Sequence, residues 1–495
     1  MTTATKCSSD SVLTDGDVRN YINGNFVSTA DTIDDFGPAT GTVIARIPRS
    51  QQADVDNAVA AAKSAYPEWK ATPVAVRAEY LHKICAAIQK EAAHLAELET
   101  LDCGKPISLT SQVEIPRAAL NFKFFAEFAT GDETQSHEMA DAVNITQRAP
   151  VGVAALITPW NLPLYLLTWK VAPALLCGNT IVAKPSELTP LTANALAQII
   201  HSVGLPAGVF NLVHGYGAEC GGPLVGHEDV SLVSFTGGTA TGKLVAATAA
   251  PQFKKLSLEL GGKNAAIIFK DCENDDWDNM IATTVRSSFL NSGQVCLCCS
   301  RILVEESVYD RFVTDFVKGV EALRIGRPLD KDTTTGALSS RAHVEKVRSY
   351  IQLAKEEGGV ILTGGVIPDL KEEFAEGFWL KPTVIAGLDP RTSRVATEEI
   401  FGPVVTIHTF KDAADAVDIH NSVKYGLAGT LWTSNLKQAH AVSRQMHTGM
   451  VWVNTWLHRD LRVPFGGVMA SGVGREGGKH SLEFFSELKN ICFKY

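Results

Sequence analysis

The sequence predicts an α/β protein whose parallel strands are covered by helices on both faces. Short apolar strands alternate with helices from residue 151 onwards, and a second alternating series begins near Asn264 and continues to about Pro464. Short, almost wholly apolar strands between helices are typical of parallel sheets buried on both sides. A chain of 495 residues is also too long for one hydrophobic core, so two or three compact units are expected.

The individual elements follow from hydrophobic periodicity. Apolar residues recur at helical spacing between 55 and 65, and a long alanine- and leucine-rich amphipathic stretch runs from Val74 to Leu101. From residue 151 the expected order is strand, helix, strand, helix, strand, strand and helix, at 153–157, 164–176, 180–183, 192–203, 209–213, 231–234 and from 239. A strand at 265–269 opens the second series, and the segments 143–147 and 484–495 also resemble strands.

Composition excludes several classes of protein. The net charge of −9 and the lack of a basic run give no support to nucleic-acid binding. The N-terminal segment 1–10 lacks the apolar core of a signal peptide. The most apolar region, 151–184, is interrupted by prolines and by polar residues before about 20 apolar residues accumulate, so no membrane span is expected.

Ten cysteines in so long a chain indicate reduced thiols in a cytoplasmic protein rather than a disulfide framework. Three of them crowd together at Cys296, Cys298 and Cys299. No second cysteine or histidine pair at zinc spacing follows them, so no metal site is expected.

Two short motifs carry the chemistry. Cys296 follows a turn of small residues, Asn291-Ser-Gly293, and Glu259 precedes a flexible Gly261-Gly262 corner. Most free cysteines are packing residues, and most glutamates are exposed or ion-paired. A thiol and a carboxylate that each lie beside glycine nevertheless suggest covalent catalysis, in which one group forms an intermediate and the other activates water. A catalytic thiol also requires surroundings that stabilise negative charge.

A glycine-containing turn predicts a dinucleotide site. The segment Phe235-Thr-Gly-Gly-Thr-Ala-Thr-Gly242 joins an expected strand to an expected helix. Glycine at Gly237 and Gly242 allows backbone to approach a pyrophosphate, and a helix N-terminus favours its negative charge.

Together these motifs resemble those of the aldehyde dehydrogenase superfamily, and the resemblance extends from about Asn20 to Tyr495. It implies a Rossmann-like NAD-binding domain formed by residues 1–126 and 150–260, and an α/β catalytic domain at 261–477. It also implies a small β oligomerisation arm at 127–149 and 478–495, and hence a homodimer or homotetramer, since an unpaired strand edge invites association.

The resemblance assigns roles to residues. Cys296 would attack the aldehyde, Asn161 and the Cys296 backbone N–H would stabilise the oxyanion, and Glu259 would activate water. The cofactor would be NAD⁺, because Glu187 would repel a 2′-phosphate. The residues expected to bind it are Lys184, Glu187, Trp160, Gly237, Gly242, Glu399 and Phe401. The chain departs from the family pattern at Gly238, where serine is common, and at Met469, where lysine is frequent.

Three arginines indicate which class of aldehyde is the substrate. Arg117 lies on an expected helix, and Arg459 and Arg462 lie just before Pro464-Phe-Gly-Gly467. The local sequences resemble the dehydrogenases of 2-aminomuconate 6-semialdehyde and 2-hydroxymuconate semialdehyde, whose substrate carries a carboxylate that arginine can grip through two hydrogen bonds.

Alternatives remain open at this point. The arginines could instead form structural ion pairs, for example with Glu114 or Asp460. The chain could oxidise retinal, betaine aldehyde or an aliphatic aldehyde. It could transfer the acyl group to coenzyme A, although the presence of Glu259 argues against that, or it could be a non-catalytic structural relative.

Overall fold

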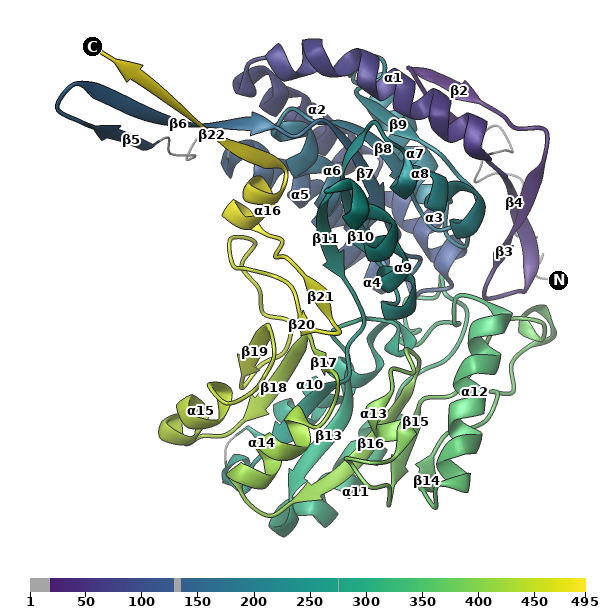
Figure 1. Ribbon diagram of the computed structural model, residues 1–495. Coiled ribbons are helices and arrows are strands. Elements are labelled where there is room, and N and C mark those ends of the chain that lie inside the picture. The colour runs from purple at the N-terminus through teal and green to yellow at the C-terminus, as the bar shows by residue number, and fades with distance from the viewer. Residues whose placement is uncertain (1–17, 129–134, 275) are drawn as a thin grey trace. The chain divides into compact units, whose positions relative to one another are not determined.

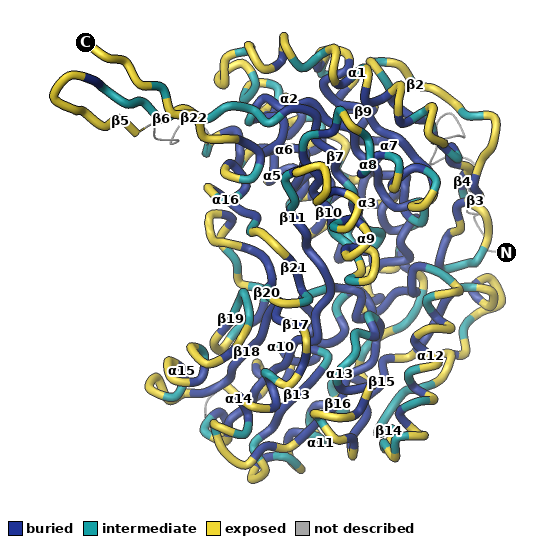
Figure 2. The backbone as a smooth tube through the Cα atoms, in the orientation of Figure 1, coloured by how far each residue is buried: buried dark blue, intermediate teal, exposed yellow. Residues whose placement is uncertain are grey.

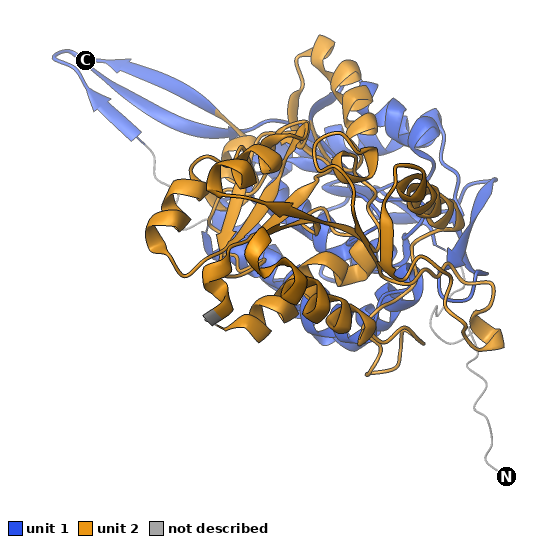
Figure 3. Ribbon diagram, turned by 90° about the horizontal axis from the view of Figure 1, so that it is seen from below, with its two compact units in different colours: residues 1–232, 488–495 blue, residues 233–487 orange. Residues whose placement is uncertain are grey.

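The computed structural model describes residues 18–128, 135–274 and 276–495, which form two compact units (Figure 3). Unit 1 comprises Met1–Leu232 with Leu488–Tyr495, and unit 2 comprises Val233–Glu487. The boundary falls inside strand β10 (Val230–Thr236). The division into three domains predicted above stays a prediction, and its segments 1–17 and 129–134 lie outside the described residues.

The centre of unit 1 is a set of parallel strands. The order is β2-β1-β9-β8-β7, and β7, β8 and β9 are parallel, with Val153 opposite Thr180 and Ile181 opposite Phe210. Antiparallel β1 and β2 extend the sheet beyond β9. The strand bounds are β1 Asn20–Ile22, β2 Asn25–Val27, β7 Val153–Ile157, β8 Thr180–Lys184 and β9 Phe210–Leu212. A separate hairpin consists of β3 Thr32–Gly37 and β4 Thr42–Pro48.

Helices cover these strands, and α1, α6 and α7 pack directly against them (Figure 1). The α-helical bounds are α1 Gln52–Ala71, α2 Val74–Lys90, α3 Ala92–Cys103, α4 Ile107–Leu109, α5 Ile115–Phe128, α6 Pro163–Leu176, α7 Leu191–Ser202 and α8 Gly222–Gly226. Almost all of α6 is buried, which accounts for the apolar stretch around it. No helix in the described part of the chain is long and apolar enough to cross a membrane.

Three strands form a narrow separate sheet in the order β22-β6-β5 (Figure 1). The bounds are β5 Gln135–Glu138, β6 Ala142–Pro150 and β22 Ser486–Lys494. The C-terminal strand thus pairs with β6 of its own chain, and Asn490 Nδ2 donates to Asn144 Oδ1 at 3.0 Å. Both outer strands are largely exposed, so their free edges are open to pairing.

Unit 2 contains a seven-stranded sheet in the order β14-β15-β16-β13-β12-β18-β19, parallel except for the edge strand β14. Its bounds are β12 Asn264–Ile268, β13 Cys299–Glu305, β14 Val360–Thr363, β15 Thr383–Ala386, β16 Val404–Phe410, β18 Ala428–Trp432 and β19 Met450–Val453. Alternate residues face opposite sides: Ile268 packs on one helical layer and Ile267 on the other. Figure 2 shows these central strands as buried.

Helices cover both faces of this sheet, and α12 (Arg341–Glu356) packs against its β14-β15-β16 end. One layer contains α10 (Trp277–Phe289) and α11 (Tyr309–Glu321), and the other contains α14 (Ala413–Asn421) and α15 (Leu436–Ser443). The predicted α/β architecture is therefore confirmed. The remaining α-helices and strands of unit 2 are α9 Thr239–Ala249, α13 Arg394–Thr397, α16 Gly478–Phe484, β11 Lys255–Glu259, β17 Tyr425–Gly426, β20 Val468–Met469 and β21 Gly472–Val473. The short 3₁₀ and π turns join these elements.

Candidate active site

The turn before Cys296 has an unusual backbone. Asn291, Ser292 and Gly293 have φ angles of 51°, 54° and 71°, so three successive residues are left-handed. Each non-glycine residue in this region costs about 1–2 kcal/mol. A Cβ on Gly293 would lie 2.1 Å from Gly402 O, so only glycine fits there. The sequence predicted a turn of small residues, and the structure shows that the turn is also strained.

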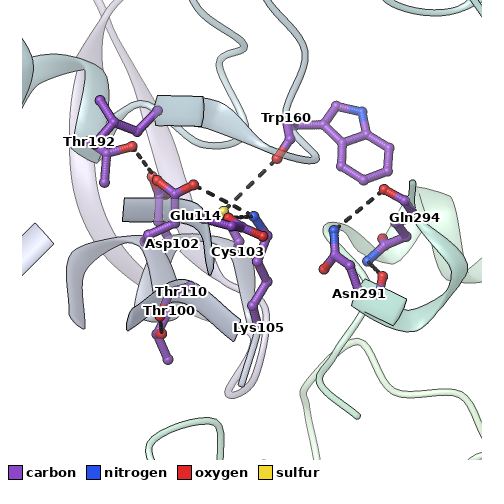
Figure 4. Close-up of polar contacts among 12 residues, drawn as sticks. Thr100, Asp102, Cys103, Lys105, Thr110, Glu114, Trp160, Thr192, Asn291 and Gln294 are labelled. Atoms are coloured by element: carbon purple, nitrogen blue, oxygen red, sulfur yellow. Dashed lines mark hydrogen bonds and ion pairs between the residues drawn. The ribbon is translucent and has the colours of Figure 1, made fainter. Parts of the chain in front are cut away.

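Side chains hold this strained turn in place. Ser292 Oγ donates to Gly336 O at 2.8 Å. Gln294 Nε2 donates to Asn291 O at 3.1 Å, and Gln294 Oε1 accepts from the Ser339 N–H at 3.0 Å. Figure 4 shows Asn291 and Gln294 facing each other across the turn. The thiol therefore follows a segment with a fixed conformation.

Glu259 is the last residue of β11, and only 4% of it is exposed. Its carbonyl accepts from the Gly237 N–H at 3.0 Å, and Glu259 lies opposite Gly472 of β21. A Cβ on Gly466 would lie 2.8 Å from Glu259 Oε1. The carboxylate is thus enclosed by glycine backbone, at the position where β11 ends and the Gly-Gly corner begins.

The Gly261-Gly262 corner touches two other predicted site residues. The Gly262 N–H donates to Glu399 Oε1 at 2.9 Å, and a Cβ on Gly261 would lie only 2.0 Å from Glu399 Oε2. On the other side, a Cβ on Gly262 would lie 3.0 Å from Cys296 O. Glycine is required here because a carboxylate and a carbonyl both approach the corner. Unit 2 thereby brings Cys296, Glu259 and Glu399 together.

The electrostatics at Cys296 differ from the expectation. The pKa of the Cys296 thiol is raised to about 12, mainly by burial and then by the negative charges of Glu259 and Glu399, while the charge of Arg459 opposes them. The prediction that the surroundings of the thiol stabilise negative charge is therefore wrong for the protein alone. The reason is that the thiol is buried and that two carboxylates lie near the sulfur. The resting thiol is protonated, so a base or an added positive charge must activate it.

Arg459 and Arg462 have different environments. The Arg459 guanidinium lies 4.1 Å from the centre of the Phe465 ring, and its charge acts on Cys296. The Arg462 side chain is 69% exposed and forms a two-point ion pair with Asp460, with Nη2 2.6 Å from Oδ2. The structural ion pair considered for these arginines is thus present at Arg462.

Arg117 is held in a fixed orientation within unit 1. Its Nε donates to Asn121 Oδ1 at 2.8 Å, and its guanidinium lies 4.8 Å from the Tyr165 ring centre and 5.1 Å from that of Trp169. Asn121 is fully buried and donates in turn to Tyr165 O at 3.1 Å. Stacked aromatic rings and an anchored Nε orient the planar guanidinium, as two-point binding of a carboxylate requires.

Trp160 and Asn161 lie in the turn between β7 and α6. Asn161 is 4% exposed, and its amide can donate two hydrogen bonds, which suits an oxyanion. Cys103 Sγ approaches Trp160 O at 4.0 Å, and the indole points away from that contact (Figure 4). These residues follow a buried parallel strand, the usual place for binding groups in such sheets.

Lys184 and Glu187 form a compact donor and acceptor pair where β8 ends. Lys184 Nζ donates to Pro185 O at 3.0 Å and to Glu187 Oε2 at 3.3 Å. The lysine side chain is 4% exposed and the glutamate side chain 27%. A ribose diol needs both a donor and an acceptor, so the pair fits the adenosine ribose expected from the sequence.

The predicted phosphate turn lies between β10 and α9, and its two selected glycines are also tightly packed. A Cβ on Gly237 would meet the Phe235 ring at 2.5 Å, and one on Gly242 would meet Leu260 at 2.4 Å. These glycines are therefore required by packing inside the protein. Gly238, the N-cap of α9, has nothing within 4 Å of its Cβ position. The open backbone at this helix N-terminus is suited to a phosphate.

Phe401 also has a strained backbone, with φ 63°. His343 Nε2 donates to Phe401 O at 2.6 Å, and the two rings lie 6.3 Å apart. Burial lowers the pKa of His343 to about 4, so the histidine is neutral and its Nε2 carries the proton that the carbonyl accepts. Non-glycine strain of this kind is common at ligand-binding positions.

A buried ionic cluster in unit 1 was missed by the sequence analysis. Lys105 Nζ lies 2.6 Å from Glu114 Oε2 and 3.6 Å from Glu99 Oε1, and Thr192 Oγ1 donates to Glu99 at 2.6 Å (Figure 4). At most 1% of each charged side chain is exposed. The charges of Glu99, Lys105 and Glu114 do not follow helical i, i+4 spacing, so the sequence gave no local signal for their pairing. Among the described residues, no group of three or more acidic, histidine or cysteine side chains could hold a metal ion.

Comparison with known proteins agrees with this geometry. The family model described as "Aldehyde dehydrogenase family" matches residues 26–491. The chain is 48% identical to 2-hydroxymuconic semialdehyde dehydrogenase of Pseudomonas sp. (strain CF600), over 97% of this chain and 99% of that protein. It is 46% identical to 2-aminomuconic semialdehyde dehydrogenase of Danio rerio, over 97% of this chain and 98% of that protein.

Solved structures give the same result. The crystal structure of betaine aldehyde dehydrogenase from Staphylococcus aureus in complex with NAD⁺ superposes with a TM-score of 0.94 at 36% identity, and the match covers 98% of this chain and 96% of that one. Both the match to the family model and the relatives span nearly the whole sequence. The chain belongs to the aldehyde dehydrogenase family.

Proposed function

We propose that this protein oxidises a carboxylate-bearing muconate semialdehyde, either the 2-hydroxy or the 2-amino form, to the dicarboxylic acid with NAD⁺. The observation that carries this proposal is the guanidinium of Arg459, which lies 4.1 Å from the centre of the Phe465 ring, and a Cβ on the next residue, Gly466, would lie 2.8 Å from Glu259 Oε1. The names of the two relatives described above support the same substrate class.

The proposed chemistry uses Cys296 and Glu259 of unit 2 and Asn161 of unit 1. The Cys296 thiol gives its proton to solvent, the thiolate attacks the aldehyde carbon, and the Asn161 amide with the Cys296 N–H stabilises the resulting oxyanion. NAD⁺, when bound, supplies the hydride acceptor. Loss of hydride from the carbon leaves a thioester on Cys296. Glu259 then removes a proton from water, which attacks the thioester and releases the acid.

The cofactor residues form two groups. In unit 1, Lys184 and Glu187 would hold the adenosine ribose, and Trp160 would also contact the cofactor. In unit 2, the turn containing Gly237 and Gly242 would receive the pyrophosphate. Glu399 would hold the nicotinamide ribose, and Phe401 would pack near the ring.

The structure favours Arg459 over Arg462 as a carboxylate anchor. Arg462 is exposed and already holds Asp460, whereas Arg459 lies against Phe465 and acts on the nucleophile. Arg117 is proposed as the second anchor because stacking fixes its orientation.

The test is NADH formation by wild type and by Arg117→Ala, Arg459→Ala and Arg462→Ala. The substrates are 2-hydroxymuconate and 2-aminomuconate semialdehyde, retinal, betaine aldehyde and an aliphatic aldehyde. Loss of Arg117 should lower kcat/KM for the muconate substrates by about 2–5 kcal/mol of transition-state binding and should spare neutral aldehydes. Loss of Arg459 should lower kcat/KM for all aldehydes, because its charge opposes the raised pKa of Cys296, but by more for the muconate substrates. Arg462→Ala is the matched control and should stay within a few-fold of wild type. Preference of wild type for a neutral aldehyde would overturn the substrate assignment, and acceleration by coenzyme A would show acyl transfer instead of hydrolysis.

We also propose that the β22-β6-β5 sheet joins copies of the chain into a homodimer or homotetramer. Its two exposed outer strands, β5 and β22, support this. A cytoplasmic location is proposed because all nine cysteines among the described residues are free thiols. Light scattering of the full chain and of a chain ending at Glu487 tests the assembly.

A further inference from the structure

One buried side chain holds the segment that carries the nucleophile. Asn264, the first residue of β12, is 3% exposed. Its Nδ2 donates to Cys296 O at 2.7 Å and to Cys298 O at 3.0 Å, and its Oδ1 accepts from the Ala428 N–H at 3.0 Å. Carbonyls only accept and a backbone N–H only donates, so these partners fix the orientation of the amide.

The strand ladder explains why a side chain is needed here. Asn264 lies opposite Cys299 of β13, but the next residue, Ala265, lies opposite Arg301. β13 therefore has one extra residue at its start, and such a bulge disrupts the regular backbone pairing. A second side chain serves the same segment, since Trp456 Nε1 donates to Leu297 O at 3.1 Å. The carbonyls of residues 296, 297 and 298 are each taken by a side-chain N–H.

Asn264 also touches the corner that carries the base. A Cβ on Gly262 would lie 2.9 Å from Asn264 Oδ1 and 3.0 Å from Cys296 O. The same amide therefore contacts the corner that follows Glu259 and the carbonyl of the nucleophile. A shift of this amide would change the distance between the base and the sulfur.

We propose that Asn264 is a positioning residue that sets the place of the Cys296 thiol and backbone N–H relative to Glu259. The proposal rests on the role of Cys296 as nucleophile given above. Side chains of the turn fix residues 291–294, whereas the carbonyls of residues 296–298 accept hydrogen bonds from Asn264 and Trp456. A displacement of about 1 Å at a reacting group lowers the rate on the order of 100-fold.

Asn211 provides a matched control. It is fully buried in β9 of unit 1, its Nδ2 donates to Ile181 O at 3.1 Å and to Gly208 O at 2.8 Å, and its Oδ1 accepts from the Asn23 N–H at 2.9 Å. Its bonding is the same as that of Asn264, but none of its partners is a proposed catalytic or cofactor-binding residue. Asn264→Leu and Asn211→Leu each remove three comparable hydrogen bonds without changing charge.

The experiment compares both variants with wild type below their unfolding temperatures. We expect Asn264→Leu to lower kcat and the rate of the NADH burst on the order of 100-fold, with KM for NAD⁺ within about threefold of wild type. Asn211→Leu should lower Tm by a similar amount and keep kcat within about threefold. If Asn264→Leu does not fold, Asn264→Ala takes its place with the same expected result.

A folded Asn264 variant with wild-type kcat and burst rate would overturn the proposal, and so would an equal loss of kcat in Asn211→Leu. Failure of the proposed function would give a different result from failure of the Asn264 proposal. If wild type prefers another aldehyde, the comparison runs with that aldehyde and still tests Asn264. If Cys296→Ser retains the activity of wild type, the nucleophile assignment fails first, and the proposal falls with it.

Discussion

Replacement of Glu259 by glutamine removes a carboxylate for which we expect two effects: it activates water, and its charge raises the pKa of Cys296. The side chains have the same size, and the main-chain contacts of Glu259 with Gly237 and Gly472 do not involve the carboxylate. Loss of a general base lowers a hydrolytic step about 10²- to 10⁴-fold. The negative charge of Glu259 also raises the pKa of Cys296, so its removal should make the thiol more acidic. Turnover should therefore fall while the resting thiol becomes more reactive.

Two assays measure the effect on turnover and the effect on thiol reactivity separately. Rapid mixing with aldehyde and NAD⁺ should show a burst of about one NADH per active site in Glu259→Gln, followed by slow turnover, because thioester hydrolysis is the blocked step. Alkylation of Cys296 by iodoacetamide, without cofactor, should be faster than in wild type at the same pH. Glu398→Gln is a nearby control, since Glu398 binds Arg394 and Tyr350. Loss of the burst together with turnover would contradict the role of Glu259 in thioester hydrolysis, and an unchanged alkylation rate would contradict its effect on the thiol.

Contacts of Gly261, Cys296 and Lys105 give three further predictions. Gly261→Ala would place a Cβ 2.0 Å from Glu399 Oε2, so we expect that carboxylate to be displaced and KM for NAD⁺ to rise about 10- to 100-fold in steady-state assays. Because the pKa of Cys296 is raised to about 12, its alkylation rate without cofactor should increase about tenfold per pH unit across the neutral and alkaline range; a plateau near pH 8 would contradict this. Lys105→Met would leave the buried Glu114 carboxyl without its cation, so urea unfolding should show a loss of about 3–5 kcal/mol, and a loss below 1 kcal/mol would argue against the pair.

Local patterns predicted most of the regular elements. The strand at 153–157 has the predicted bounds, because a wholly apolar run followed by Thr158-Pro159 leaves little alternative. The stretch 74–101 was interpreted as one amphipathic segment, but it is two helices that break at Glu91, whose φ and ψ are −94° and 12°. Apolar spacing continues through that break, so periodicity could not reveal it.

The site was predictable only as far as its motifs are local. Cys296 and Glu259 could be selected because each lies in a short glycine-containing motif that resembles one of the aldehyde dehydrogenase superfamily. The hydrogen bonds from Gly262 to Glu399 and from Asn264 to the Cys296 carbonyl join segments that are distant in sequence, so no local pattern predicts them. The raised pKa of Cys296 has the same origin, since it depends on charges that only the fold brings close.

The mass of the Cys296 peptide, after Glu259→Gln is mixed with NAD⁺ and 2-hydroxymuconate semialdehyde, shows directly whether oxidation passes through a thioester on Cys296. We expect one acyl group on Cys296 and one NADH per active site, formed faster than with a neutral aliphatic aldehyde of similar length. An unmodified Cys296 while NADH is produced, or equal rates with the two aldehydes, would contradict this expectation.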